Sequence, residues 1–302
     1  MDGHDTGSRR TDGSAEGAEL TLEFARRLSE AGPSRLGEAA QATVERLHAL
    51  VTALRPTSDE FRIAIDFLTE VGHYADARRQ EWVLLADVLG VSSLVEDLNT
   101  RRPAGATPNT VAGPFYRSDV PETAQGASIS RDGKGEPLAV TGRIVDLDGQ
   151  GVAGATVEVW HANADGRYEN QEPDRQPEFN LRGRFRTDLQ GRFRFATIKP
   201  RGYALPSDGP VGRLVTTLGL RLERPAHIHF RVSADGFETL TTHVYDEADP
   251  AIGRDAIFGV KPELMGRYRV LPPDGGPRRH ALDLTLVLCP PPAERARIQG
   301  RL

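Results

Sequence analysis

The spacing of apolar residues changes near residue 102, and this change constrains the fold more than any other feature of the chain. Between about residues 18 and 99, Gly and Pro are scarce and apolar residues recur every three or four positions, which is the period of an amphipathic helix. From about residue 103 onward, Gly and Pro become frequent and the apolar period falls to two, as in strands that bury one face. We therefore predict a helical domain at 18–102 and a β-rich domain at 103–302.

Four apolar stripes predict four helices with short connections in the helical domain. The TSDEF sequence at 57–61 supplies a capping residue and early acids before the third helix, as helix N-termini prefer. The polar segment 1–17 has too few apolar residues to form a core, so we expect a disordered tail there. The stripes are Leu20, Phe24 and Leu28; Val44, Leu47, Val51 and Leu54; Phe61, Ile65, Leu68 and Val71; and Trp82, Leu85 and Leu89.

Six short segments of the second domain alternate apolar and polar residues, and turn sequences such as DLDGQG and ADGR separate them. Many short strands at this spacing are typical of an antiparallel β-sandwich, so we predict a mainly β fold of that kind behind the helical domain. The irregular segment 199–223 is long for a sandwich connection, and long ordered loops often carry function. The predicted strands are GRIVD (142–146), ATVEVW (155–160), GRFRF (191–195), HIHFRVS (227–233), TLTTHVY (239–245) and ALDLTLVL (281–288).

The composition argues against several classes of protein. The net charge of −5 gives no electrostatic reason to expect nucleic acid or an anionic membrane as a partner. Cys289 is the only cysteine, which excludes an internal disulfide framework and any site built from several cysteines, and fits the reducing cytoplasm. No apolar run reaches membrane-spanning length, and the polar start lacks the apolar core of a secretory signal. We therefore predict a cytoplasmic protein that is not embedded in a membrane.

The segment RPAHIHF at 224–230 contains the first candidate for chemistry. Side chains alternate along a strand, so His227 and His229 point to one face while Ile228 and Phe230 point to the other. A lone histidine is usually a surface residue or a satisfied core residue, but two imidazoles on one strand face converge on one point. The pair indicates a metal, and zinc and iron sites of several kinds share this spacing. Further ligands have to come from elsewhere in the chain.

Two tyrosines in loops are candidates for those ligands. Tyr168 lies in ADGRYEN, after a predicted strand and turn, and Tyr203 lies in KPRGYALPSDGP at the start of the long insertion. A tyrosine has a pKa of about 10 in water, so a phenolate at neutral pH requires a strong local cation such as a trivalent metal. A hard anionic oxygen favours Fe(III) over Fe(II) or zinc. Spacing alone does not select these two from the six tyrosines, and both also fit aromatic residues that cover turns.

Several separated motifs, in order, resemble the intradiol ring-cleaving dioxygenases of the catechol and hydroxyquinol type. The resemblance runs from about residue 20 to residue 290. The motifs are TPNTVAGPFYR (107–117), VEVWHANADGRYEN (157–170), GYALPSDGPVG (202–212), RPAHIHFRVSADGFETLTTHVYDEADP (224–250) and DAIFGVK (255–261).

The resemblance implies a mononuclear non-haem Fe(III), one per subunit, held by Tyr168, Tyr203, His227 and His229. It implies that Tyr203 and His229 are the axial ligands, that Tyr203 leaves the metal when a diol binds, and that its phenolate accepts a diol proton. The reaction implied is opening of an aromatic ring between two hydroxyl-bearing carbons, with O2 as co-substrate. A guanidinium stays charged, so Arg224, three residues before the first histidine, is expected to face negative charge that develops in the reaction. Its alternative role is an ordinary ion pair at the start of the strand.

The residues that the resemblance assigns to the pocket wall narrow the choice of substrate. The tracts LVEDLN, FRTDLQGRFRF and THVYDE are most similar to hydroxyquinol 1,2-dioxygenases, which convert 1,2,4-trihydroxybenzene to maleylacetate. A carboxylate at Asp97 would accept a hydrogen bond from the third hydroxyl, whereas catechol would leave it unpaired. The alternative role of Asp97 is a cap or an ion pair at the helix end, and catechol and chlorocatechol are the alternative substrates. The expected wall residues are Leu94, Asp97, Val111, Ala112, Gly113, Pro114, Phe115, Leu205, Pro206, Arg224 and Ile257.

Two further expectations concern assembly and a competing class of protein. The resemblance implies a homodimer formed through the N-terminal helices, which in the family can hold a phospholipid, and the apolar stripes permit such a dimer. His243 stands where catechol enzymes commonly have glutamine, and we assign it no role. The pattern GRIVDLDGQGVAGATVEVW followed by FRTDLQGRFRF also occurs in transthyretin-like modules that bind without chemistry. A module of that kind would not explain RPAHIHF or the two tyrosines in loops.

Overall fold

The computed structural model describes residues 13–76, 79–273 and 275–293. The chain divides into two compact units, residues 1–70 and 71–302. The division falls inside a helix rather than near residue 102, because the helices that follow it pack with the β domain. The predicted tail at 1–17 lies mostly outside the described residues, although residues 13–17 already belong to a helix. None of the described helices is long and apolar enough to cross a membrane.

The first unit consists of α1 (Gly13–Glu30), α2 (Arg35–Leu54) and most of α3 (Ser58–Tyr74), and α1 packs against α2. The predicted start of the third helix is confirmed. The Thr57 hydroxyl accepts the Glu60 amide at 3.2 Å, and the Glu60 carboxylate accepts the Thr57 amide at 2.7 Å, which is a reciprocal capping box. The apolar stripes in this unit remain largely exposed.

The fourth predicted helix is two helices, α4 (Glu81–Val88) and α5 (Val91–Asn99). The expectation of a single helix is wrong because Gly90 interrupts it with a φ of 73°, in the left-handed region that ends helices. Both helices belong to the second unit, and α4 packs against α6 (Pro210–Thr217). The N-terminal region therefore contains five helices among the described residues.

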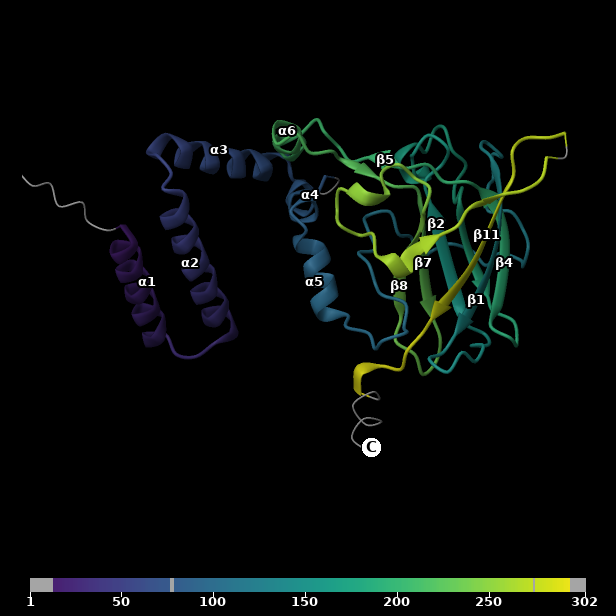
Figure 1. Ribbon diagram of the computed structural model, residues 1–302, viewed down its shortest axis with the longest axis horizontal. Helices are drawn as coiled ribbons and strands as arrows, with labels where there is room; N and C mark the ends of the chain where they lie inside the picture. Colours follow the sequence, from purple (N-terminus) through teal and green to yellow (C-terminus); the bar gives the residue numbers. More distant parts are fainter. Residues whose placement is uncertain (1–12, 77–78, 274, 294–302) are drawn as a thin grey trace, which may run out of the picture. The chain divides into compact units, whose positions relative to one another are not determined.

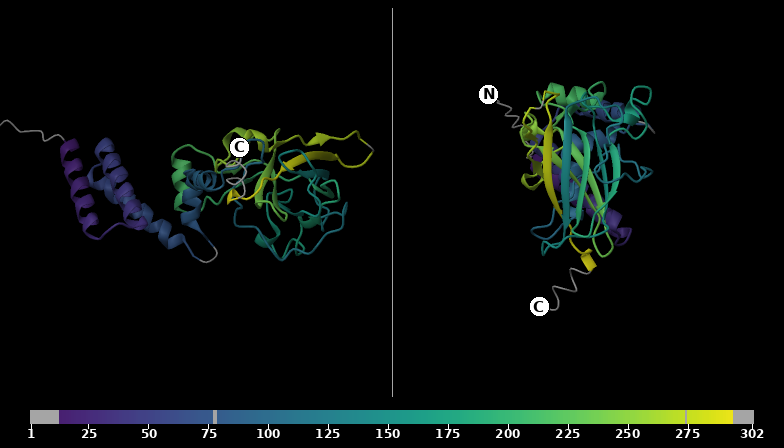
Figure 2. Two further views of the ribbon diagram at one scale, coloured as in Figure 1. Left: turned by 90° about the horizontal axis from the view of Figure 1, so that it is seen from below. Right: turned by 90° about the vertical axis from the view of Figure 1, so that its right-hand side faces the viewer.

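The second unit is a β-sandwich with strands in the order β10-β11-β1-β4 in one sheet and β3-β2-β7-β8-β9 in the other (Figures 1 and 2). All six predicted strands are present. The sheets are mixed rather than strictly antiparallel, because β1 pairs with β11 and β8 pairs with β9 in parallel. The strands are β1 (Pro137–Val145), β2 (Thr156–His161), β3 (Arg182–Arg186), β4 (Arg192–Ile198), β7 (His227–Ser233), β8 (Leu240–Asp246), β9 (Met265–Gly266), β10 (Arg269–Val270) and β11 (His280–Val287).

The core lies between the two sheets and follows from the period-two pattern. In β1 the residues that face inward are buried and alternate with exposed ones, so each strand contributes one apolar face. Phe193 and Phe195 of one sheet lie in the same buried cluster as Val157 and Phe230 of the other. Gly142 is required at its position, since a Cβ there would lie 2.1 Å from the Phe193 ring.

The long insertion at 199–223 is ordered. It contains β5 (Tyr203–Ala204) and α6, and it returns through β6 (Glu223–Arg224), which pairs with β5. Buried Glu81 of α4 accepts the amide of Val211 in the first turn of α6 at 3.1 Å. The two ends of the insertion thus pair with each other and α4 holds its middle, and the insertion carries Tyr203 back to the sheet that contains the histidine pair.

Candidate metal centre

The histidine pair lies on β7, with the side-chain directions expected for a strand. His227 and His229 are both 2% exposed, whereas Ile228 and Phe230 belong to the apolar core between the sheets. The two imidazoles therefore occupy the face of the sheet that turns away from that core. On the neighbouring strand β8, His243 is the direct partner of His229.

Tyr168 reaches the same place from the turn after β2. The Asn163 side chain accepts the amides of Asp165 at 2.9 Å and Arg167 at 3.0 Å, and this turn directs the chain back over the sheet. Tyr168 then precedes a short 3₁₀ helix, η1 (Glu169–Gln171), and its side chain is 1% exposed. Gly166 has a φ of 78°, and a Cβ there would lie 2.8 Å from Cβ of Tyr203, so glycine lets the two tyrosine segments approach.

The four expected ligands converge. The Tyr168 hydroxyl lies 2.9 Å from Nε2 of His229, and Nε2 of His227 lies 3.2 Å from Nε2 of His229. The Tyr203 ring lies 5.9 Å from the Tyr168 ring and 5.7 Å from the His227 ring, between centroids. Two ligands bound at a right angle, each ~2.1 Å from a metal, are ~3.0 Å apart. The two atom-to-atom distances, 2.9 and 3.2 Å, therefore match the distance between neighbouring ligand atoms on one metal.

Hydrogen bonds and burial set the protonation of the donors. Nδ1 of His227 donates to the carbonyl of Pro225 at 2.7 Å, so Nε2 carries the lone pair that faces the centre. Burial lowers the pKa of His227 and of His229 well below the usual range, which keeps both rings neutral. Burial, and next the neighbouring Tyr203, raises the pKa of Tyr168 well above its usual value. A phenolate at Tyr168 therefore requires a strong cation, and the donor set fits Fe(III).

His243 is a third imidazole in this cluster, and the sequence analysis gave it no role. It is 1% exposed, and its ring centroid lies 4.2 Å from that of His229. Its Nδ1 lies 2.5 Å from the Thr110 hydroxyl, and its Nε2 is buried without a hydrogen-bond partner among the described residues. His227, His229 and His243 together form a group that could hold a metal. The register of β7 against β8 was the signal needed to find it.

Arg224 is buried beside the histidines. Its Nε donates to Asp255 at 3.0 Å, and its Nη2 donates to the Tyr245 hydroxyl at 3.0 Å. Its Nη1 lies 3.5 Å from Nε2 of His227. The guanidinium is 3% exposed, so a partly neutralised cation is held at the edge of the proposed coordination shell. The position of Arg224 is compatible with its expected role near developing negative charge. Arg224 also forms an ion pair with Asp255, so the two expected roles do not exclude each other.

The expected wall residues fall into three groups. Phe115 stacks on Tyr168 with centroids 4.3 Å apart, and a Cβ at Gly113 would lie 3.9 Å from the His229 ring. Leu94 and Asp97 on α5 are exposed, and Asp97 pairs with Lys261, which also donates to the Asn109 carbonyl. The remaining wall residues are buried Ile257, half-buried Val111 and Leu205, and exposed Ala112, Pro114 and Pro206.

Asp87 is a carboxylate near the site that the sequence analysis missed. It lies in the last turn of α4 and is half-buried. Burial raises its pKa, while the Ser92 side chain and the Arg224 charge act in the opposite direction. Its Oδ1 is buried without a hydrogen-bond partner among the described residues. Asp87 and Asp97 each follow a leucine by three positions on a helix, so the sequence pattern did not separate them.

Known families match nearly the whole chain. Residues 34–107 match the family described as catechol dioxygenase N terminus, and residues 111–289 match the family described as dioxygenase. The chain belongs to the intradiol ring-cleaving dioxygenases. This family implies a non-haem iron and O2, and the tyrosine and histidine donors described above are compatible with both. The expectation drawn from the separated motifs is confirmed.

Three named proteins show what this intradiol dioxygenase is similar to. Hydroxyquinol 1,2-dioxygenase of Rhizobium sp. (strain MTP-10005) is 49% identical over 80% of this chain and 82% of its own length. 6-Chlorohydroxyquinol 1,2-dioxygenase of Cupriavidus pinatubonensis is 41% identical over 90% of this chain and 96% of its own length. The structure of hydroxyquinol 1,2-dioxygenase from Pseudomonas putida DLL-E4 superposes with a TM-score of 0.88 at 34% identity, covering 92% of this chain and all of that one.

Proposed function

We propose that the protein opens hydroxyquinol between its 1- and 2-hydroxyl carbons with O2, giving maleylacetate, and that Tyr168, Tyr203, His227 and His229 hold one Fe(III) per subunit for this reaction. The observation that carries the metal assignment is the approach of the Tyr168 hydroxyl and the two Nε2 atoms to within 2.9 and 3.2 Å. The names of the relatives from Rhizobium and Pseudomonas support the choice of hydroxyquinol.

Fe(III) held by these residues would supply a Lewis acid for the diol and make its ring reactive toward O2. The chain supplies the proton acceptor and the electrostatics. Tyr203 is the half-buried tyrosine of the two, so its phenolate is the base within reach of an entering diol. Arg224, fixed by Asp255 and Tyr245, offers a preorganised cation where negative charge develops.

A carboxylate in the pocket would distinguish hydroxyquinol from catechol, because only the former has a third hydroxyl to donate to it. We proposed Asp97 from the sequence, but its carboxylate is half-exposed and already paired with Lys261. Asp87 has a buried oxygen without a partner and feels the Arg224 charge, so we propose Asp87 as the better candidate. Catechol and chlorinated diols remain the alternative substrates.

A second candidate is a zinc or Fe(II) centre made of three histidines. The position of His243 beside His227 and His229 favours it, since three imidazoles are a common ligand set for these metals. That arrangement leaves Tyr168 and Tyr203 without a role. A transthyretin-like binding module leaves the buried histidines unexplained as well.

Visible absorption and metal content distinguish the candidate metal centres, and steady-state kinetics distinguishes the candidate substrates. Phenolate bound to Fe(III) absorbs visible light, so the purified protein is expected to be wine-red without added cofactor, with about one iron per chain. Its kcat/KM for hydroxyquinol is expected to exceed that for catechol. A colourless protein that contains stoichiometric iron or zinc would overturn the ligand assignment, and a preference for catechol would overturn the substrate.

We also propose a homodimer formed through the N-terminal helices. The support is the exposed apolar surface of the first unit, where Leu22, Phe61 and Ile63 are 70%, 58% and 67% exposed. Sedimentation of the purified protein at several concentrations tests it, and a monomer throughout would exclude it. Mass spectrometry of an organic extract tests for the phospholipid that the family can hold. The cytoplasmic location rests on the cysteine content and remains a prediction.

A further inference from the structure

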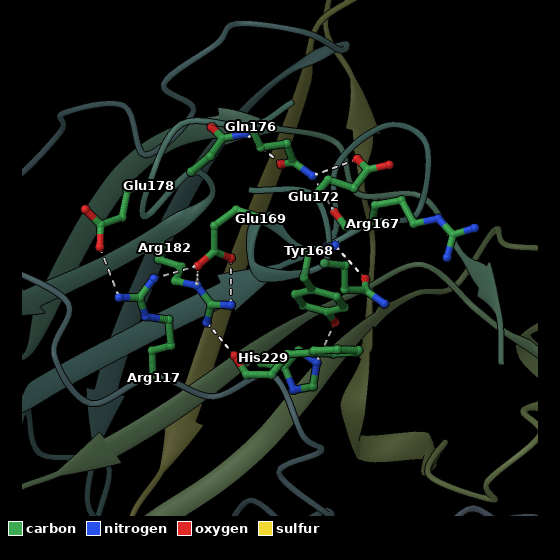
Figure 3. A network of polar contacts seen from close by, with 12 residues as sticks. Arg117, Arg167, Tyr168, Glu169, Glu172, Gln176, Glu178, Arg182 and His229 are labelled. Atoms are coloured by element: carbon green, nitrogen blue, oxygen red, sulfur yellow. Dashed lines mark hydrogen bonds and ion pairs between the residues drawn. The ribbon is translucent and has the colours of Figure 1, made fainter. Parts of the chain in front are cut away.

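A buried ion pair lies beside Tyr168 (Figure 3). Glu169 follows Tyr168 in the chain, and Arg182 comes from β3. Nε of the guanidinium donates to Oε1 of the carboxylate at 2.7 Å, and Nη2 lies 2.7 Å from Oε2 as an ion pair without hydrogen-bond geometry. The side chains are 1% and 3% exposed. Arg117 approaches Glu169 from the outer side at 3.3 Å.

Such a pair is a poor way to stabilise a fold. Removing both charges from water costs nearly as much as their attraction returns, and apolar residues of similar size would serve as well. Stability alone therefore does not account for the pair, whereas its geometry suits the positioning of neighbouring groups. A planar guanidinium that donates to one carboxylate oxygen and lies against the other restricts both the distance and the orientation of that carboxylate. Glu169 is thereby held in one position, and with it the backbone that begins at Tyr168.

Arg182 also holds the other side of the Tyr168 ring. Its Nη1 donates to the carbonyl of Phe115 at 2.6 Å. The Phe115 ring stacks on the Tyr168 ring at 4.3 Å with an angle of 22° between the planes. One buried cation therefore fixes the backbone next to the tyrosine and also the aromatic residue that covers its face.

Tyr203 has no comparable support among the contacts described. It is half-buried and lies on the two-residue strand β5, which pairs only with β6. Its ring is perpendicular to the Tyr168 ring, at 86°, and tilted by 47° to the His227 ring, so it stacks on neither. The two tyrosines thus differ in how firmly the chain positions them.

We propose that Arg182 and Glu169 are positioning residues that keep Tyr168 on the metal and Phe115 against its ring. This inference rests on the Fe(III) centre proposed above. Both residues act through Tyr168 and Phe115. The pair also sets the charge beside the Tyr168 phenolate, so a change in the pair is expected to shift the visible charge-transfer band.

The test compares Arg182→Met and Glu169→Gln with the parent holoenzyme. Arg182→Met leaves Glu169 negative beside Tyr168, which raises the energy of the phenolate electrons and moves the visible charge-transfer band to longer wavelength. Glu169→Gln leaves the arginines uncompensated and moves the band to shorter wavelength. Each variant is expected to lose about 10- to 100-fold in iron affinity or kcat, the usual effect of removing support behind a ligand.

Arg184→Met is the matched control. Arg184 lies on the same strand and face, donates to the Ser118 carbonyl at 2.6 Å and pairs with Glu158 at 2.8 Å. Its band, iron content and kcat are expected to match the parent. If Arg182→Met does not fold, the band of Glu169→Gln decides alone, because Gln keeps the size of the side chain. Bands and kcat unchanged in both variants would overturn the proposal, whereas a parent without any visible band would overturn the Fe(III) centre instead.

Discussion

Tyr203 and Arg224 face each other as direct partners in the short ladder formed by β5 and β6. The proposed base and the proposed electrostatic group are therefore positioned by one small element. It pairs with neither large sheet, and its geometry depends on both ends of the insertion. A change in this ladder is expected to affect proton transfer and charge stabilisation together.

Replacing Tyr203 with Phe is expected to weaken and shift the visible band, because only one phenolate remains on the metal. Turnover is expected to fall by about 10²- to 10⁴-fold, the usual contribution of a general base. Absorption spectra and steady-state kinetics measure both effects. The control is Tyr268→Phe, which removes a buried hydroxyl that donates to the Val244 carbonyl at 3.2 Å, away from the four ligands. An unchanged band in Tyr203→Phe would show that Tyr203 is not a ligand.

Replacing Arg224 with Lys is expected to lower kcat by about 100-fold while iron content and colour stay unchanged. Lysine keeps the charge, but it cannot donate to Asp255 and Tyr245 at the same time in the geometry seen for the guanidinium. Arg254→Lys is the control, since Arg254 is 49% exposed and forms a surface pair with Glu223. Loss of iron from Arg224→Lys would instead assign Arg224 to support of the histidine ligands.

The sequence predicted those features that depend on local periodicity. The alternation in HIHFRVS was sufficient to place His227 and His229 on one face, because a strand admits only two side-chain directions. Gly90 was visible in the sequence, but the helical period continues on both sides of it, so the break between α4 and α5 was missed. Its positive φ is a property of the folded backbone.

The features that were missed depend on which strands become neighbours. His243 enters the centre only because β8 pairs with β7 in the observed register. Arg182 and Arg184 lie on one face of β3, and charged residues at this spacing are typical of a strand face in solvent. Arg182 is nevertheless only 3% exposed. Tyr168 and Tyr203 come from different loops, and only the resemblance to a family joined them to the histidines before the structure did.

The preference for hydroxyquinol over catechol is expected to depend on Asp87 rather than on Asp97. Asp87→Asn replaces a charged acceptor with a neutral amide, which is expected to reduce the ratio of the two kcat/KM values by about 10- to 100-fold, the worth of a hydrogen bond to a charged group. Asp97→Asn is the matched variant, and the ratio is expected to stay at the parent value because Asp97 already pairs with Lys261. The reverse result would restore Asp97 to the pocket wall.

The stability of the protein is expected to fall between pH 6.5 and pH 4 because of His161. This ring is 1% exposed, its Nδ1 donates to the Ala162 carbonyl at 2.8 Å, and its Nε2 accepts the Thr197 hydroxyl at 2.7 Å. Burial lowers the pKa of His161 to about 4. The unfolded chain binds a proton near pH 6.5, before the folded chain does, so protonation favours unfolding in this range.

The pKa difference corresponds to a loss of about 3 kcal/mol in the free energy of unfolding on going from pH 7 to pH 4. Urea titrations of the parent and of His161→Gln across this range measure it, because the other buried histidines contribute to both proteins and cancel in the difference. The parent is expected to lose more stability than the variant as the pH falls through this window. Equal pH dependence in the two proteins would mean that His161 is protonated at the same pH in the folded and the unfolded chain.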